Sequence, residues 1–329
     1  LNVRDGEVLV PATIFNSDGT VKEYRAEAFT TLRWRPSTKL ETELGVAFEA
    51  SQIKQSSIDV NSSRSLAFAK PTFSAYWDVT PRDKLFFTIV RDVDQLDFGQ
   101  FVANITQTEQ ELEAGNPDLN PVRSWDYKLG LERRLANGAG VLSGALFYSD
   151  VQDVRGRLRA SPESLLSFIS NIGSGREYGI DGEISLDFSR LGWWDGVLKV
   201  NSLRRHTSVT DPFDNNTRPF GFTTNWESTA EYRHEIKTFI DGHIGFNYSQ
   251  TGARFINDID KRDRLKTQGS VAITIEHRLS DTFRISLSSN NILNQRESRR
   301  RQFFAFTPDG RREIRASRVQ NAKWGRIIN

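Results

Sequence analysis

Hydrophobic and polar residues alternate along most of this chain. Between residues 178 and 188, the apolar positions Tyr178, Ile180 and Ile184 alternate with Asp181 and Glu183. A period of two is typical of a β-strand with one apolar and one polar face. The same pattern recurs at residues 25–35, 40–50, 66–79, 84–91, 125–131, 141–150, 196–203, 224–232, 240–248, 270–278 and 282–292. It predicts an all-β protein of about fourteen strands, in which residues 161–169 could add one turn of helix within a loop.

The apolar faces carry almost no charge, although charged residues make up 26% of the chain. A face of five positions would be free of charge by chance about once in five at this composition. Its recurrence on successive strands indicates surroundings that exclude charge. The mixture of Ala, Thr, Ser and Gly with aromatic residues fits lipid at least as well as a packed protein core.

The connections between the predicted strands alternate in length. Short ones at 36–39, 80–83, 136–140, 189–196, 235–237 and 279–281 alternate with long ones at 52–64, 95–122, 155–175, 208–221, 251–266 and 295–316. A meander then has every long loop at one end, as in outer-membrane barrels with short periplasmic turns and long extracellular loops. Greek-key sandwiches mix both lengths at both ends. The fold expected is therefore a transmembrane antiparallel up-and-down β-barrel.

Tryptophans lie near the ends of the predicted strands, where a membrane barrel carries its interfacial girdles. They are Trp34, Trp77, Trp125, Trp193, Trp194 and Trp226. The alternative is that these indoles cap an ordinary β core.

Composition narrows the classes further. The 329 residues contain no Cys and no Met, and the formal net charge is +2. A helical membrane span would need roughly 20 consecutive apolar residues, which the chain lacks. A nearly neutral chain gives no electrostatic argument for nucleic acid. The missing initiator Met makes Leu1 an unexpected translation start, so a fragment or a processed chain is expected.

Two motifs resemble those of the TonB-dependent outer-membrane receptors. The stretch "GNPDLNPVRSWDYKLGLERRL" at 115–135 resembles the family's Asn-Pro-x-Leu-x-Pro motif, which ends a long extracellular loop. "ISLSSNNILNQ" at 285–295 resembles the segment that leads into the last long loop. The matching positions are Asn116, Pro117, Leu119, Pro121, Trp125, Tyr127, Asn291, Leu293 and Asn294. Residues 85–102, 171–188 and 226–235 are similar to other strands of this family.

The resemblance implies a function and a location. Residues 1–329 would be the C-terminal portion of a receptor barrel, with about fourteen of a probable 22 strands, and the N-terminal plug and first strands would lie outside this chain. The protein would lie in the bacterial cell outer membrane. It would bind an extracellular solute, such as a siderophore-type iron chelate, a sugar or another nutrient, and import it to the periplasm by TonB-coupled active transport. Neither an enzyme activity nor a cofactor is implied.

The resemblance also implies partners. They are outer-membrane lipid and lipopolysaccharide, the protein's own plug, and a TonB-type energy-coupling complex that acts through the missing N-terminus. No nucleic acid is expected, and the small-molecule ligand is unknown. Two departures from the family pattern are the missing coupling box and the ending "WGRIIN" in place of a terminal aromatic residue.

The candidate ligand site is an arginine-rich segment on the last long loop. Its predicted members are Arg296, Arg299, Arg300, Arg301, Phe303, Phe304, Arg311 and Arg312, with Phe306, Arg315 and Arg318 close by. Guanidinium groups suit phosphate and carboxylate. Three interpretations stand: capture of an anionic ligand, contact with lipopolysaccharide phosphates outside the barrel, and pairing with Asp and Glu of neighbouring loops.

Other chemistry is weakly signalled. His206, His234, His243 and His277 are widely spaced and are expected to face the lumen. Acidic runs at 92–97 and 257–263 offer oxygen ligands for a cation without matching a known calcium loop. The polar strand faces should line the lumen: Glu41, Glu43, Glu49, Asp126, Lys128, Glu132, Asp181, Glu183, Asp187, Glu227 and Glu231. The alternatives are a passive porin or adhesin-like barrel without energy coupling, a barrel-embedded hydrolase and a soluble β-sandwich.

Overall fold

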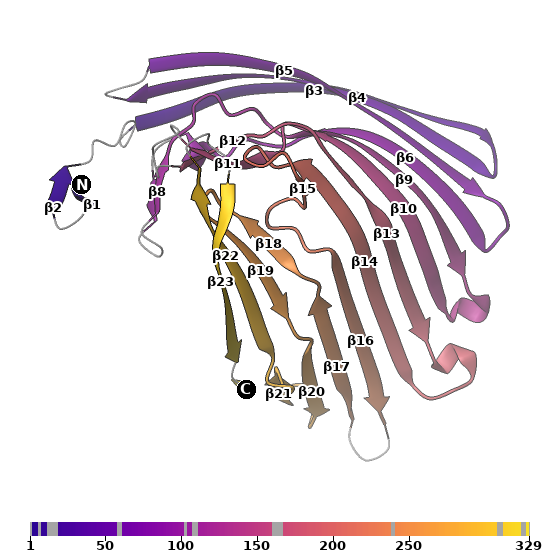
Figure 1. Ribbon diagram of the computed structural model, residues 1–329. Helices are drawn as coiled ribbons and strands as arrows, with labels where there is room; N and C mark the ends of the chain where they lie inside the picture. Colours follow the sequence, from indigo (N-terminus) through magenta and orange to yellow (C-terminus); the bar gives the residue numbers. More distant parts are fainter. Residues whose placement is uncertain are drawn as a thin grey trace.

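The computed structural model describes residues 2–5, 8–11, 19–57, 61–101, 104–106, 111–159, 167–237, 241–307, 312–323 and 327–328. One large antiparallel sheet dominates it. The strands of this sheet are β3 (Gly19–Ser37), β4 (Leu40–Ser57), β5 (Asn61–Asp78), β6 (Asp83–Val93), β9 (Arg123–Arg134), β10 (Gly140–Gln152), β13 (Gly175–Asp187), β14 (Gly196–Thr210), β15 (Thr217–Arg218), β16 (Trp226–Ile236), β17 (Gly242–Thr251), β20 (Ser270–Arg278), β21 (Arg284–Asn290) and β24 (Ile327–Ile328). Each long strand pairs with its neighbour along the chain, and the sheet curves into an open trough with β3 at one edge (Figure 1). The prediction of an up-and-down β-barrel is confirmed, and the barrel in this chain is a partial one.

Smaller elements lie in the connections at one end of the sheet. They are β7 (Asn104–Thr106), β8 (Glu111–Ala114), β11 (Arg155–Arg159), β12 (Ser167–Asn171), β18 (Arg254–Asn257), β19 (Lys261–Thr267), β22 (Arg296–Phe306), β23 (Arg312–Lys323) and the 3₁₀ turn η1 (Phe98–Gln100). The order β11-β12-β8-β7 forms one small sheet and β18-β19-β22-β23 another. A separate pair, β1 (Asn2–Asp5) and β2 (Val8–Pro11), precedes the large sheet.

At the opposite end of the sheet, the connections in the described part of the chain are tight, as the spacing predicted. Two of them contain the short 3₁₀ turns η2 (Ala136–Gly138) and η3 (Ser189–Leu191). Among the helices in the described part of the chain, none is long and apolar enough to cross a membrane.

Parts of three predicted loops are strands instead. Strands β4 and β5 continue their ladder as far as the pair Ser56 and Asn61, so most of the long loop expected at 52–64 is strand, and residues 58–60 lie outside the described residues. The segments 251–266 and 295–316 contain β18, β19, β22 and β23. These strands carry polar residues on both faces, which removes the alternation on which the prediction relied. Residues 167–169, where a helical turn was considered, belong to β12, and residues 161–166 lie outside the described residues.

Apolar residues share the outer face of the large sheet. One ladder row joins Leu44, Phe73, Ile89, Tyr127 and Tyr148 from β4 to β10. Side chains on this face stay uncovered, with Phe48 59% and Leu146 60% exposed. A face of large uncovered apolar residues is the surface that a membrane barrel presents to lipid.

Aromatic clusters mark both borders of this apolar face. Near the short turns, Phe188, Trp193 and Trp194 pack on one another and on Tyr232, and Trp194 Nε1 donates to Tyr232 Oη at 2.7 Å. Toward the loop end, Tyr178 pairs with Tyr148 and packs beside His206. Tyr178 and Phe188 are ten positions apart, which corresponds to roughly 25 Å across a membrane for strands of ~3.3 Å rise per residue tilted by ~40°. This height matches the apolar band of outer-membrane barrels.

Candidate ligand-binding site at the extracellular end

The first family-like motif holds the loop end together. Leu119 is fully buried and packs with Ile53, Leu96 and Phe101. Pro117 and Pro121 keep the flanking backbone out of the strand ladder. The motif is therefore a structural anchor beneath the loops.

Asparagines complete this anchor. Asn116 Nδ2 donates to the carbonyl of Ile169 at 2.8 Å. Asn171 Oδ1 accepts from the amide of Asn120 at 2.8 Å, and Asn171 Nδ2 donates to the carbonyl of Asp153 at 2.9 Å. Two long loops are joined by these bonds.

The second motif forms the turn after β21. Asn291 and Asn294 both have positive φ, 54° and 52°, a conformation that asparagine tolerates better than most residues. Asn291 Oδ1 accepts from the amide of Gln295 at 2.7 Å. Leu293 is exposed. The turn directs the chain into β22 above the sheet.

The arginine-rich segment is mostly the strand β22, and part of it pairs with acids. Arg301 Nε donates to Asp263 Oδ1 at 2.7 Å, and Arg299 Nε donates to Asp263 Oδ2 at 2.7 Å. Asp263 is only 1% exposed. Burial alone would raise the pKa of Asp263, but the hydrogen bonds from Arg301 and Arg299 outweigh burial and hold the pKa below its usual value.

A second buried carboxylate collects three guanidinium groups. Asp211 Oδ2 lies 2.7 Å from Arg312 Nη2, 2.8 Å from Arg218 Nε and 3.1 Å from Arg262 Nη2. Asp211 and the Arg312 side chain are each 1% exposed. Burial opposes ionisation of Asp211, yet the Phe213 amide and the three arginines bring its pKa below the usual value. Burial lowers the pKa of Arg218 and Arg312, which still leaves both cationic at neutral pH.

Aromatic rings surround this ion-pair cluster of Asp211, Arg218, Arg262 and Arg312, which is called the Asp211 knot below. The Arg312 guanidinium lies 4.2 Å from the ring centroid of Phe304 and 5.1 Å from that of Phe213. Phe306 meets Phe213 edge to face at 5.5 Å and lies 4.0 Å from the Arg159 guanidinium. The predicted Phe303 lies 5.9 Å from Arg301. Three connections that are remote in sequence are thus joined at one place.

The structure divides the predicted arginines into groups. Arg299, Arg301 and Arg312 pair with acids of neighbouring loops, as the third interpretation proposed. Arg296 and Arg300 are exposed, with no acidic partner in the described part of the chain. Arg311 lies outside the described residues. Sequence reasoning missed Asp211, Phe213, Arg218 and Arg262, because ion pairing between distant loops leaves no local pattern.

The acidic runs considered for a cation are used differently. Asp263 binds arginines, and Asp258 Oδ1 accepts a hydrogen bond from the Ile259 amide at 2.8 Å. Lys261 Nζ and Arg157 Nε each lie 3.9 Å from the Asp258 carboxylate. Asp97 accepts from the Gly99 amide. Within the described ranges, no three His, Asp or Glu residues are grouped so that they could hold a metal ion.

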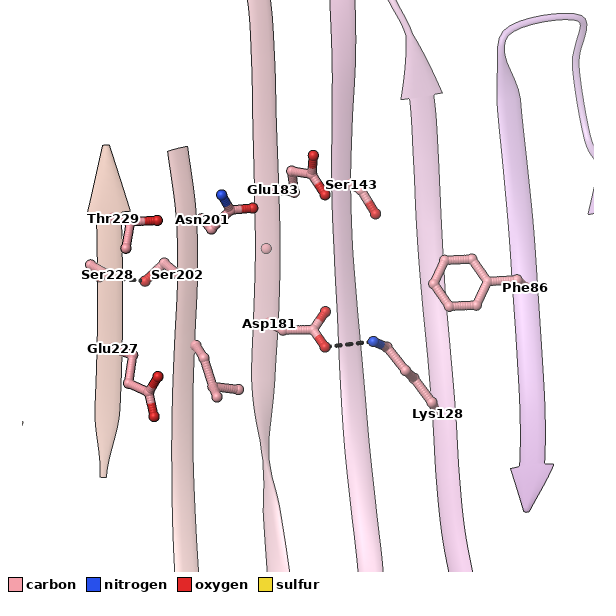
Figure 2. Close-up of a pocket in the computed structure, with 12 residues that line it drawn as sticks. Phe86, Lys128, Ser143, Asp181, Glu183, Asn201, Ser202, Glu227, Ser228 and Thr229 are labelled. Carbon is pink, nitrogen blue, oxygen red and sulfur yellow. Dashed lines mark hydrogen bonds and ion pairs between the residues drawn. The ribbon is translucent and has the colours of Figure 1, made fainter. Parts of the chain in front are cut away.

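The concave face of the sheet carries the polar residues predicted to line the lumen. Figure 2 shows a depression on this wall, where Lys128 Nζ lies 2.6 Å from Asp181 Oδ2. Glu183, Asn201 and Glu227 point into the same space from neighbouring strands (Figure 2). Farther round, Glu49 pairs with Lys70 at 2.7 Å. The predicted orientation of the polar faces is confirmed.

The expectation for the histidines is wrong for three of the four. His206, His234 and His277 are in register with Tyr178, Ile244 and Ile285 on the outer, apolar face. Only His243 lies on the inner face, where its Nδ1 is 4.0 Å from Glu276. Their even or odd position along each strand, rather than their polarity, decides which side they face.

A curved antiparallel sheet with an apolar outer face, two aromatic borders, a charged interior and all long loops at one end defines an outer-membrane β-barrel. The chain belongs to the TonB dependent receptor-like β-barrel family, whose family model matches residues 2–292. This membership places it in the bacterial outer membrane. No curated protein sequence matches the chain.

Solved structures share the fold at low sequence identity. The ferric yersiniabactin uptake receptor FyuA from Yersinia pestis matches with a TM-score of 0.65 at 15% identity, over 94% of this chain and 45% of that one. The ferric citrate transporter FecA matches with a TM-score of 0.65 at 10% identity, over 96% of this chain and 47% of that one. The copper transporter OprC matches with a TM-score of 0.63 at 11% identity, over 83% of this chain and 42% of that one. The chain spans about half the length of these proteins or less.

Proposed function

We propose that the protein containing this chain is an outer-membrane receptor that imports an extracellular nutrient by TonB-coupled transport. The observation that carries the proposal is the combination of a charged inner wall, represented by Lys128 and Asp181, with interlocked loops above it. A wall of this kind can hold a polar plug. Loops fixed on a rigid barrel can bind a solute at the mouth.

The nutrient we propose is a metal chelate or a related small solute. The support is the family membership together with the names of the similar structures, which describe uptake of ferric yersiniabactin, ferric citrate and copper. Residues 1–329 would form the C-terminal portion of the barrel domain. The earlier strands, a plug domain, a TonB-type complex and surrounding lipopolysaccharide complete the proposed assembly.

The mechanism is a shift of populations and requires no covalent step. Solute bound at the loops would favour the plug conformation that the energy-coupling complex can engage. The predicted residues Arg296 and Arg300 remain available for that contact, since they are exposed. Arg299, Arg301 and Arg312 would act indirectly, by fixing the loops through Asp263 and Asp211.

The test uses the native bacterium. Deletion of the gene should abolish high-affinity uptake of one radiolabelled metal chelate from a panel, and the intact gene should restore it. Removal of the TonB-type protein should abolish the same uptake. Uptake that continues at an unchanged rate without TonB would overturn the proposal in favour of the passive porin.

A further inference from the structure

We propose that the extracellular sheet β18-β19-β22-β23 binds a multivalent anionic solute on its inward side, through Arg264, Lys266, Arg296, Arg300 and Lys323. These five residues are called the inward basic face below. The proposal rests on the proposed import function and specifies the chemistry of the solute.

Strand register determines which side these residues face. Ser249 pairs with Ser270 in the large sheet, and Arg254 pairs with Leu265 above it, so one register continues through the whole hairpin. Odd positions of β20 lie on the outer, lipid-facing side, as shown by Ile275, which pairs with Leu287 and is exposed like it. The even positions Arg264 and Lys266 therefore lie on the side that continues the inner wall.

The pairing extends this assignment to the next two strands. Arg300 is the direct partner of Arg264, and Ser298 is the partner of Lys266. Lys323 is the direct partner of Arg296. Directly opposed residues share a face, so all five basic residues belong to the inward side. Figure 1 shows this sheet at the same end as β11 and β12.

Charge is segregated between the two sides of the sheet. The inward side of the described strands carries seven charged residues, all of them basic: Arg262, Arg264, Lys266, Arg296, Arg300, Arg312 and Lys323. The outward side includes the acids Asp263, Glu297 and Glu313 among its bases. The chain has 44 basic and 42 acidic residues. If charges were distributed at random, seven charged residues on one side of a sheet would all be basic roughly one time in a hundred.

Two like-charge pairs show that the inward basic face is costly without an anion. Arg264 opposes Arg300 and Arg296 opposes Lys323, and like charges placed directly opposite destabilise a sheet. All five residues are exposed and have no acidic partner among the described residues. A bound anion would turn this repulsion into attraction.

Geometry favours one molecule with several charges. Opposed side chains start about 4.5–5.5 Å apart at their Cβ atoms, so two carboxylates or phosphates of one solute can bridge them. At the upper end of the same side lies the Asp211 knot, where Phe213 and Phe304 contact Arg312. A small solute could reach the inward side from the lumen, whereas lipopolysaccharide would meet the outward side.

The experiment is calorimetric titration of the detergent-purified, full-length protein at low salt. Citrate and tripolyphosphate are the multivalent probes, and acetate is the monovalent one. We expect at least one multivalent anion to bind, with acetate much weaker. The double variant Arg264→Gln/Arg300→Gln should lower that affinity by about tenfold or more, because two charge-assisted contacts are removed.

Two matched controls make the result decisive. Arg318→Gln removes an exposed arginine from the outward side of the same sheet and should leave the affinity within about twofold. Arg264→Lys/Arg300→Lys keeps the charge and should restore most of the binding. A loss as large as that of the Gln variant would show a structural effect and overturn the proposal.

Other outcomes also contradict the inference. Binding that Arg318→Gln abolishes, and the inward double variant does not, would place the anion on the outer surface, as expected for a lipid phosphate. Absence of binding by both multivalent probes would end the proposal even if TonB-dependent uptake were intact. Anion binding without TonB-dependent uptake would contradict the import function alone.

Discussion

Asp211 is the residue on which the loop knot depends. Its carboxylate faces Arg218, Arg262 and Arg312 at 2.8, 3.1 and 2.7 Å, so three cations share one buried anion. Asp214 lies farther away, 3.9 Å from Arg312. Removal of the central carboxylate would leave mutually repelling charges in a site with little water.

Substitution Asp211→Asn should therefore destabilise the knot strongly. Loss of one partner of a buried ion pair costs about 3–5 kcal/mol, and the local opening free energy should fall by a comparable amount. Hydrogen exchange of the 211–218 amides, followed by mass spectrometry, measures this change. The matched variant Asp214→Asn should shift exchange by less than about 1 kcal/mol; equal effects would show that Asp211 has no special role.

The knot should also respond to acid. The pKa values of Asp211 and Asp263 in the folded protein lie below the ordinary carboxyl value. The two carboxylates therefore contribute their full stabilisation at any pH above the carboxyl pKa of the unfolded chain. It is lost as the pH falls through the folded-state values, below about pH 4. Proteolysis of the extracellular loops should stay slow from pH 7 to 5 and accelerate below pH 4. Acceleration between pH 6 and 5 would contradict the assignment.

At the residue scale, the sequence identifies which charged residues form a candidate site, but it does not identify the residues with which they pair. The arginine-rich segment was recognisable, but Arg312 and Asp211 are 101 positions apart and occupy different loops. Pairing at such separation depends on how the loops at one end of the sheet pack together, and no periodicity in the sequence indicates it. Only pairs along one hairpin, such as Arg264 and Arg300, follow once the strand register is known.

Strands are better predicted inside the apolar band than above it. Alternation identified β13 and β10 correctly because one of their faces meets lipid. Beyond the band both faces meet water, so β18, β19, β22 and β23 keep their hydrogen bonds but lose the apolar period. Backbone pairing with a neighbouring strand maintains them, and this support is invisible in the local sequence.

Adjacent positions on β17 test the face assignment. Phe246 lies on the outer face opposite Tyr232, whereas Asn247 lies on the inner face opposite Glu231. Phe246→Arg should cost about 2–4 kcal/mol, because an arginine would be placed in the hydrocarbon. Asn247→Arg should cost far less, with a carboxylate directly across. Unfolding of the purified, refolded receptor in lipid vesicles provides the measurement, and equal costs would invalidate the assignment.

At the largest scale, the described part of this chain forms an open trough. Among the described strands of the large sheet, the 19-residue strand β3 is hydrogen-bonded to β4 alone. An unpaired sheet edge is not tolerated in hydrocarbon, so we propose that further strands close the barrel. The up-and-down order was predictable because connection length alternates along the chain. The curvature of the sheet and the contacts between distant loops were not predictable, since they follow from strand twist and loop packing.

Because the charged residues described on the inward side of the extracellular sheet are all basic, that side has a positive electrostatic field, whose range depends on the salt concentration of the surroundings. The field of the inward basic face reaches about 10 Å at 0.1 M salt and about 30 Å at 0.01 M. In fresh water the mouth would thus attract a multivalent anion from a distance comparable to the bilayer thickness, and encounter would be fast. In brackish water the same field would reach only about 10 Å, so the proposed capture of an anionic solute would depend on salinity.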